Sequence, residues 1–296
     1  MADLHVPVMV DEVLEHLLDR EDGIYADVTT GTGGHAEAIL ERIGPNGRLI
    51  CLDQDPVALE IARGRLGNED ARVRFHRGNY AKLDGVLAAE GISGFDGILA
   101  DIGLNSYTLA RPEAGMSYQQ DVPLDMAVDP DLPFSAAEYL LRVDEAALVD
   151  TFQEFGDLRR ARLYARRIVE RRRAEPIRTT GDLVRTVRDR DRQVDAGELS
   201  RIFQAIRVVV LDEMPRLEGL LDGIGDWLQP GGRFVIISYA GHEEKRLKRW
   251  MKGVTSPEGP FEALTRRPIG PTREEVGKNR RARSARLRAV RKRGEG

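Results

Sequence analysis

The sequence predicts an α/β fold in which a parallel sheet wrapped by helices carries an inserted small helical domain. Over the first hundred residues, short apolar runs that suit strands alternate with runs of helical spacing, a pattern typical of a parallel sheet. Three glycines, Gly31, Gly33 and Gly34, lie between the first expected strand and the first expected helix. The spacing turns helical from about residue 134 to 190, and strands resume afterwards.

The first part of the chain supplies the expected sheet. Its strands lie near 24–29, 48–53, 72–76 and 96–101, and its helices near 34–43, 56–66 and 80–90. After these elements, residues 103–133 are rich in Gly, Pro and Asp and have no sustained period, so they are expected to form a long loop. The loop is expected to be ordered, because apolar and aromatic anchors recur along it. They are Tyr107, Met116, Tyr118, Leu124 and Met126.

The second part is expected to complete the insertion and close the sheet. A capping box at Thr179–Asp182 predicts a helix start within the insertion. A long apolar-faced helix over 198–222 is expected to pack back on the sheet. A turn over 228–233, a strand over 234–238 and a helix over 242–252 follow, and then two strands at 261–266 and 284–290. These elements divide the chain into residues 1–105 and 198–296 for the main domain and 106–197 for the insertion.

Composition excludes several classes of protein. The single cysteine, Cys51, rules out an intrachain disulfide or a cysteine-based metal site, and five scattered histidines give no ligand spacing for a metal. Residues 1–20 mix acidic and apolar positions, unlike a signal peptide, and no apolar run reaches membrane-spanning length. We therefore expect a soluble cytoplasmic protein with no membrane partner.

Positive charge is concentrated although the net charge is −4. Residues 265–293 hold twelve Lys or Arg against two Glu, and a second arginine-rich segment spans 159–173. A basic block can be a solvated tail, but two such regions in an acidic protein favour phosphate binding on one basic face.

The glycine cluster predicts a nucleotide-like cofactor. Glycines let the backbone take positive φ and let a ligand approach closely, and the following helix offers free N–H groups to an anion. Asp53, about twenty residues further on, is placed to hold ribose hydroxyls. Gly31-x-Gly33-x-x-Ala36 also satisfies the dinucleotide fingerprint, so NAD and S-adenosylmethionine both remain at this point.

The last two expected strands favour S-adenosylmethionine over NAD. They lie close together in sequence, which is typical of the Rossmann-like sheet of class I S-adenosylmethionine-dependent methyltransferases with its antiparallel last strand. A dinucleotide dehydrogenase would instead continue with crossover connections.

A series of motifs in fixed order narrows the assignment further. They are His5-Val6-Pro7-Val8-Met9, Asp27-x-Thr29-x-Gly31-x-Gly33-Gly34-His35, Asp53-Gln54-Asp55-Pro56, Asp101-Ile102-Gly103, Pro123-Leu124-Asp125-Met126, Phe203-Gln204-Ala205-Ile206-Arg207 and Asn279-Arg280-Arg281-Ala282-Arg283-Ser284-Ala285-Arg286-Leu287-Arg288. Through them the sequence resembles, over nearly its whole length, the bacterial enzymes that methylate the exocyclic N4 of a decoding-centre cytosine in 16S ribosomal RNA.

The resemblance implies a set of site residues and partners. S-adenosylmethionine is expected to contact the glycine turn, an aromatic side chain and strand-end carboxylates. These residues are Gly31, Gly33, Gly34, His35, Asp53, Tyr80, Asp101 and Thr108. Asp101 or Asn105 is expected to accept a hydrogen bond from the cytosine amino group. Arg280, Arg281, Arg283, Arg286 and Arg288 are expected to contact the RNA backbone of 16S rRNA or the small ribosomal subunit. A homodimer remains open.

The sequence departs from the family pattern around the expected acceptor pocket. Thr108 stands where the family has glutamine, and Ala114 and Ala127 stand where it has arginine. After the fifth strand, Ser238-Tyr239-Ala240-Gly241 replaces Ser-Phe-His-Ser, and Leu211 replaces an asparagine. The alternatives are therefore a paralogue that methylates another RNA site, a small-molecule methyltransferase, and a non-catalytic ribosome-assembly protein that binds cofactor and RNA.

Overall fold

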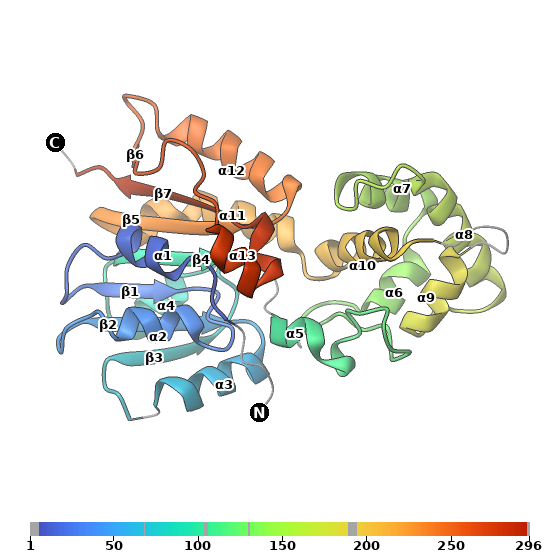
Figure 1. Ribbon diagram of the computed structural model, residues 1–296, viewed down its shortest axis with the longest axis horizontal. Coiled ribbons are helices and arrows are strands. Elements are labelled where there is room, and N and C mark those ends of the chain that lie inside the picture. Colours follow the sequence, from blue (N-terminus) through green and yellow to red (C-terminus); the bar gives the residue numbers. More distant parts are fainter. Residues whose placement is uncertain (1–5, 68, 104–105, 130, 189–193, 295–296) are drawn as a thin grey trace. The chain divides into compact units, whose positions relative to one another are not determined.

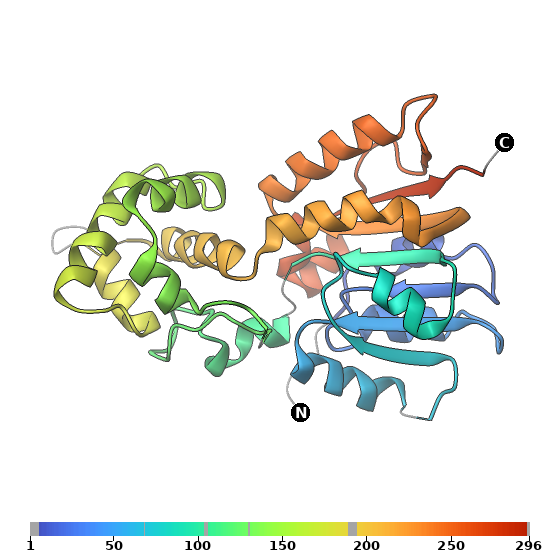
Figure 2. The same cartoon turned by 180° about the vertical axis from the view of Figure 1, so that it is seen from behind.

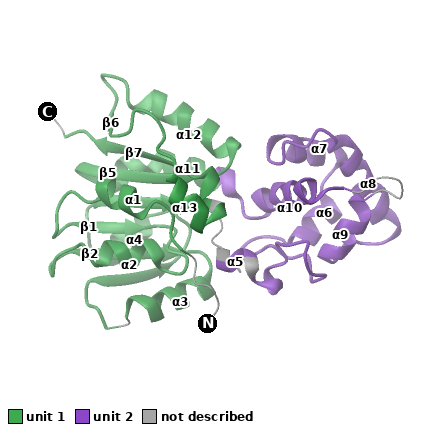
Figure 3. Ribbon diagram, viewed as in Figure 1, with its two compact units in different colours: residues 1–105, 216–296 green, residues 106–215 purple. Residues whose placement is uncertain are grey.

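The computed structural model describes residues 6–67, 69–103, 106–129, 131–188 and 194–294. It divides into two compact units (Figures 1 and 3). The first unit comprises Met1–Asn105 and Arg216–Gly296, and the second comprises Ser106–Pro215. The chain therefore leaves the first unit after its fourth strand and returns to it before the fifth. Among the described residues, no helix is long and apolar enough to cross a membrane.

The first unit is built on one seven-stranded sheet with the order β3-β2-β1-β4-β5-β7-β6. Strands β1 to β5 are parallel, and β7 runs antiparallel to both β5 and β6. This closing antiparallel strand confirms the expected class I methyltransferase sheet. The strands are β1 (Ile24–Asp27), β2 (Arg48–Asp53), β3 (Val73–Arg77), β4 (Phe95–Asp101), β5 (Leu228–Ser238), β6 (Phe261–Ala263) and β7 (Arg286–Lys292).

Three neighbouring parallel strands end in an aspartate at the same edge of the sheet. In the register of the sheet, Asp27 of β1 lies opposite Cys51 of β2 and Leu99 of β4. Asp53 and Asp101 each end their strand two residues further on. Because carboxyl ends of parallel strands form one edge, the three carboxyl groups gather where α/β sheets bind ligands.

Helices cover both faces of this sheet. In Figure 1, α1 (Val10–Leu17), α2 (Gly34–Leu40) and α13 (Arg273–Lys278) lie in front of the strands. Seen from behind in Figure 2, teal α4 (Asp84–Glu90) and orange α11 (Glu213–Trp227) cover the other face. Three further segments complete the unit: α3 (Pro56–Leu66), α12 (Gly241–Val254) and the 3-10 turn η2 (Arg280–Ser284). With both faces covered, the parallel strands bury nearly continuous apolar runs, as in β4.

Two expectations for the return to the sheet are corrected. The expected helix over 198–222 is two helices, α10 (Ala196–Val210) and α11, which are separated at Leu211 and Asp212. Asp212 has a left-handed φ of 54°, and the ring of Pro215 excludes a helical carbonyl four residues earlier. As a result α10 belongs to the second unit, and the units divide at Pro215 rather than after residue 197.

The expected turn over 228–233 lies inside β5. Phe95 of β4 pairs with Leu228, and Gly97 pairs with Arg233. The four residues between Leu228 and Arg233 therefore bulge out of the ladder, and Gly231 takes a φ of 82°. Glycine is the residue that adopts this conformation at little cost.

The second unit is helical. Its helices are α5 (Ser106–Ala110), α6 (Ala136–Arg142), α7 (Glu145–Glu154), α8 (Ala161–Ala174), α9 (Thr180–Val187) and α10, with the 3-10 turn η1 (Pro112–Ala114). The predicted capping box is confirmed, since the Thr179 side chain accepts the Asp182 N–H and Asp182 accepts that of Thr179. The loop after α5 is anchored as expected, because the Tyr118 ring contacts Phe203 and its hydroxyl donates to the Ala196 carbonyl.

Candidate active site

The glycine turn after β1 is tightly packed. Gly31 and Gly33 take positive φ angles of 53° and 85°. A Cβ on Gly33 would lie 3.2 Å from the Ala62 side chain, and one on Gly34 would lie 3.1 Å from the ring of Pro7. Gly31 and Gly33 therefore suit glycine by conformation, a Cβ at Gly33 or Gly34 would also be crowded, and the N-terminal segment lies directly against the turn.

Asp53 is bound to the same turn across the sheet edge. Its Oδ2 accepts the Gly31 N–H at 2.7 Å, and its Oδ1 accepts the Asp55 N–H at 2.9 Å. Each carboxylate oxygen has a second lone pair, so the group retains acceptor capacity for hydroxyls of a ligand. Burial raises the pKa of Asp53 to about 6, against the lowering effect of these backbone donors.

Asp101 is held by neighbours from three different segments. Its backbone N–H donates to Thr29 Oγ1 at 2.6 Å, and the Tyr239 hydroxyl donates to its Oδ1 at 2.9 Å. His35 Nδ1 lies 3.8 Å from its Oδ2. Burial, together with the adjacent Asp101 carboxylate, raises the pKa of Tyr239 far above its usual value. The hydroxyl therefore stays a hydrogen-bond donor at physiological pH.

His35 connects this group to the N-terminal segment. Its Nε2 lies 2.8 Å from the Val8 carbonyl oxygen, and only an N–H can donate to a carbonyl. This bond assigns the proton to Nε2 and turns Nδ1 toward Asp101. The neighbouring Met9 N–H donates to Glu275 of α13 at 2.6 Å. Segments near the two ends of the chain therefore meet beside the glycine turn.

Asp27, which begins the motif that contains the glycine turn, also belongs to this site, although no role was predicted for it. Its side chain is buried, and its Oδ1 accepts the Thr29 N–H at 3.2 Å. Its Oδ2 is also buried and has no hydrogen-bond partner in the described part of the chain. Burial raises the pKa of Asp27 to about 7, although the nearby His35 opposes this. The signal available in the sequence was an acidic residue at the end of a strand before a glycine turn.

The other expected cofactor residues, Tyr80 and Thr108, belong to different units. Tyr80 is half-buried in the turn after β3, and Gly78 in the same turn donates to the Asp53 carbonyl. Tyr80 thus follows a strand that ends at the same edge. Thr108 is buried in α5 of the second unit. Asn105, the other expected catalytic residue, lies outside the described residues.

The basic C-terminal motif divides into exposed and structural arginines. Arg280 and Arg283 of η2 are exposed, and Arg286 is half-buried with its Nη1 on the Ala285 carbonyl at 2.7 Å. Arg288 is buried on β7, where its guanidinium binds both carboxylate oxygens of Glu244 at 3.2 and 3.0 Å. The expected RNA contact of Arg288 is therefore corrected, because its charge is neutralised under α12. The Arg281 side chain lies outside the described atoms.

The chain is similar to known methyltransferases over its full length. A family model described as the MraW methylase family matches residues 2–293. A ribosomal RNA small subunit methyltransferase H of Desulfosudis oleivorans is 39% identical over 311 residues, covering 99% of this chain and 100% of that protein. A protein of the same name from Symbiobacterium thermophilum is 39% identical over 308 residues, covering 98% and 97%. Among solved structures, an rRNA methylase from Streptococcus thermophilus gives a TM-score of 0.45 at 12% identity, covering 96% of this chain and 93% of that one.

Proposed function

The chain belongs to the MraW methylase family, and from this premise we propose that it methylates the exocyclic N4 of a decoding-centre cytosine in 16S ribosomal RNA. It is a small-subunit ribosomal RNA methyltransferase that uses S-adenosylmethionine. The observation that carries the proposal is the convergence of the glycine turn, Asp53 and Asp101 at one sheet edge. A nucleoside-bearing methyl donor and an amino acceptor both need polar groups there.

The residues present fit S-adenosylmethionine. In the turn of Gly31, Gly33 and Gly34, a Cβ on Gly33 or Gly34 would be crowded against Ala62 or Pro7, and a backbone without side chains is one that a ligand can approach closely. Asp53 keeps free lone pairs for ribose hydroxyls, and the buried Asp27 Oδ2 can accept a polar hydrogen. Tyr80 is the aromatic group proposed to flank the adenine. His35 and Thr108 complete the proposed cofactor set.

Asp101 is the proposed catalytic residue. The cofactor supplies, when bound, a methyl group on a cationic sulfur that leaves as a neutral thioether. Little covalent help is needed, so alignment of donor and acceptor is the main contribution of the protein. The N4 lone pair is delocalised into the cytosine ring. A hydrogen bond from the amino group to Asp101 favours sp³ character at nitrogen, and the same carboxylate is proposed to take the proton that the methylated nitrogen releases, while Tyr239 fixes the carboxylate orientation. Asn105 is the second proposed contact.

The RNA must present the cytosine outside a helix. A stacked and paired base cannot reach groups at a sheet edge, so the nucleotide is proposed to be turned out or already unpaired. The exposed Arg280 and Arg283, with Arg286 and Arg281, are proposed to hold the sugar–phosphate backbone. Arg288 is left out of this set, because Glu244 already binds it.

The experiment that tests the proposal is transfer of radiolabelled methyl from S-adenosylmethionine to small ribosomal subunits and to naked 16S rRNA, with nuclease mapping of the product. Label on the decoding-centre cytosine is the expected result. Label on another nucleotide would indicate a paralogue, and transfer to small molecules alone would indicate a different substrate class. Tight cofactor binding without any transfer would favour a non-catalytic assembly role.

Replacing Tyr239 by phenylalanine is expected to lower kcat by about tenfold. The change removes only the hydroxyl that donates to Asp101 Oδ1, and hydrogen bonds to charged groups are worth about 1.5–3 kcal/mol. The acid limb of kcat against pH should move to higher pH, since the carboxylate loses a donor that favours its charged form. The Kd of S-adenosylmethionine, measured by calorimetry, should stay within about twofold. An unchanged pH profile would show that the hydroxyl has no part in positioning Asp101.

A further inference from the structure

Helix α12 has one face committed to the interior of the first unit. Leu247 and Met251 are buried, and the Trp250 ring contacts Phe234 of β5 and Phe261 of β6. Its indole N–H also donates to the Leu221 carbonyl of α11 at 3.0 Å. These contacts fix the rotation of the helix about its axis, so the opposite face is turned to solvent.

The acidic residues of α12 are also directed inward. Glu243 is buried and accepts the backbone N–H groups of Tyr239 and Ala240 at 2.8 and 2.9 Å. Glu244 binds the buried Arg288 and lies 3.1 Å from the Ser238 hydroxyl. Neither carboxylate is therefore available to neutralise cations on the outer face.

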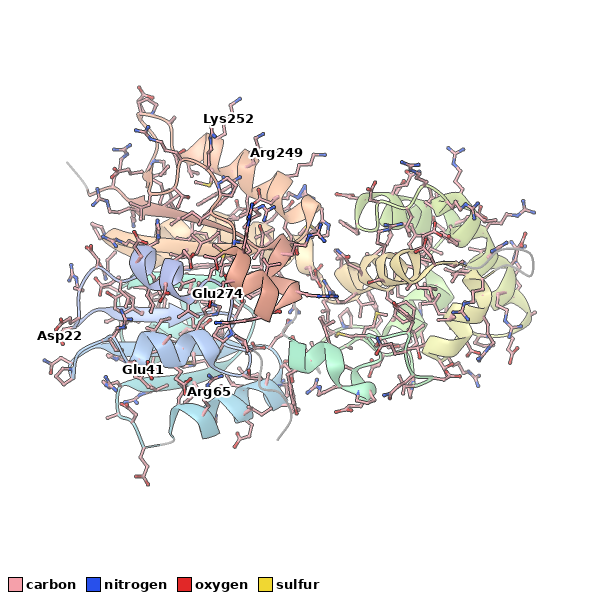
Figure 4. The ribbon with its side chains drawn as sticks, viewed as in Figure 1. Asp22, Glu41, Arg65, Arg249, Lys252 and Glu274 are labelled. Atoms are coloured by element: carbon pink, nitrogen blue, oxygen red, sulfur yellow. The ribbon has the colours of Figure 1, made fainter. Side chains whose placement is uncertain are left out.

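The outer face carries four cations, which we call the α12 stripe: Lys245, Lys248, Arg249 and Lys252. All four side chains are exposed, and their spacing of three, four and seven residues places them along one side of the helix. They span about 10 Å at the helical rise of 1.5 Å per residue. Arg249 and Lys252 extend from α12 away from the sheet (Figure 4).

The α12 stripe differs from other cations on the surface of the same unit. Exposed Arg20 lies 3.5 Å from Asp96, and exposed Lys278 lies 2.8 Å from Glu274. Within the described part of the chain, the four stripe residues have neither an ion pair nor a side-chain hydrogen bond. A protein with a net charge of −4 thus keeps four uncompensated positive charges in one row.

We propose that the α12 stripe is a docking surface for the sugar–phosphate backbone of RNA. The inference rests on the proposed rRNA substrate and adds a contact separate from the C-terminal arginines. Lys and Arg contacts to phosphate give sequence-independent affinity and fix orientation. A membrane surface fits less well, because interfacial helices expose an apolar face to lipid and α12 buries its own. The helix begins two residues after Tyr239, so RNA held on the stripe is oriented relative to the Asp101–Tyr239 pair.

The test compares two triple variants that remove the same charge. Lys248→Gln, Arg249→Gln and Lys252→Gln are combined in the stripe variant. Arg42→Gln, Arg74→Gln and Lys82→Gln are combined in the control variant, whose positions are exposed. Arg74 lies on β3, which is at the opposite edge of the sheet from β6. Binding of a 16S rRNA fragment is measured by fluorescence anisotropy between about 50 and 200 mM salt.

The stripe variant is expected to bind the fragment roughly ten- to a hundredfold more weakly at the lowest salt concentration, with the slope of log K against log salt reduced by about two. The control variant should keep a slope within about half a unit of wild type. Equal losses in the two variants would overturn the proposal, because only net charge would then matter. A stripe variant that binds like wild type would overturn it as well.

A charge-conserving variant excludes a folding artefact. Lys248→Arg, Arg249→Lys and Lys252→Arg combined should restore the wild-type slope, and failure to restore it would count against the proposal. Binding is measured without turnover, so the two proposals fail separately. If the stripe variant binds RNA more weakly but the wild-type protein transfers no methyl group, the proposed function alone is overturned. If the wild-type protein transfers methyl but the stripe variant binds RNA as tightly as wild type, the docking surface alone is overturned.

Discussion

Replacing Asp101 by alanine is expected to lower kcat for methylation of small-subunit rRNA by about 100-fold, the scale typical of a lost acid–base or hydrogen-bonding group. Asp101 ends β4, where its backbone N–H donates to Thr29 Oγ1 and its carboxylate is oriented by the Tyr239 hydroxyl. Alanine leaves nothing to accept the amino hydrogen as nitrogen gains sp³ character. The measurement is single-turnover methyl transfer at saturating cofactor, which separates this loss from weaker S-adenosylmethionine binding.

Asp96→Ala is the matched control. Asp96 lies at the other end of β4, where its Oδ2 accepts the Ile24 N–H at 2.8 Å. Its loss should lower the free energy of unfolding by about 1 kcal/mol while kcat stays near wild type. If Asp101→Ala turns over as fast as Asp96→Ala, the amino group is not held by Asp101, and Asn105 becomes the next position to change.

Local pattern was sufficient to predict the sheet edge that carries the site. The first four strands lie within two residues of their expected bounds, since buried parallel strands show up as short apolar runs between turn signals. The glycine turn and Asp53 were predicted to act together, and the Gly31 N–H does bind Asp53 across the edge. Turn chemistry and strand ends are local properties, so one sequence is enough to predict them.

Features set by long-range packing were not predictable. Arg288 is part of a basic run, yet strand pairing places it beneath α12, where Glu244 lies 44 residues away in sequence. The Tyr239 hydroxyl reaches Asp101 across 138 residues. Nothing local distinguishes these side chains from solvent-exposed arginines or core aromatics. The helix break at Asp212 is an intermediate case. Pro215 is a local signal for a helix break, but the wide apolar face over residues 198–222 favoured one continuous helix.

Asp27→Asn is expected to stabilise the cofactor-free protein at pH 8 by up to about 4 kcal/mol, the free energy that corresponds to a pKa shift of about three units. The pKa of Asp27 is near 7 in the folded chain because the group is buried, against 3.8 for an ordinary aspartate. Between these values the folded state binds a proton that the unfolded state has released. The contribution is fully present below about pH 4 and is lost as pH rises toward 7. Asparagine stays neutral throughout this range and keeps an oxygen for the Thr29 N–H.

Urea unfolding followed at about pH 5 and pH 8 measures this difference, with Asp22→Asn as the matched control. Asp22 is exposed in the loop before β1 and is labelled in Figure 4, so its change should leave the pH dependence intact. From pH 5 to pH 8, the free energy of unfolding should fall more in the wild type than in Asp27→Asn.

Asp27→Asn should also bind S-adenosylmethionine more weakly. The Asp27 Oδ2 has no hydrogen-bond partner among the described residues, so we expect it to accept a hydrogen bond from the ligand, and its burial costs stability in the absence of that ligand. Equal pH dependence in Asp27→Asn and wild type would mean that the buried carboxyl is compensated in the folded chain, and the argument for a ligand-directed oxygen would fail with it.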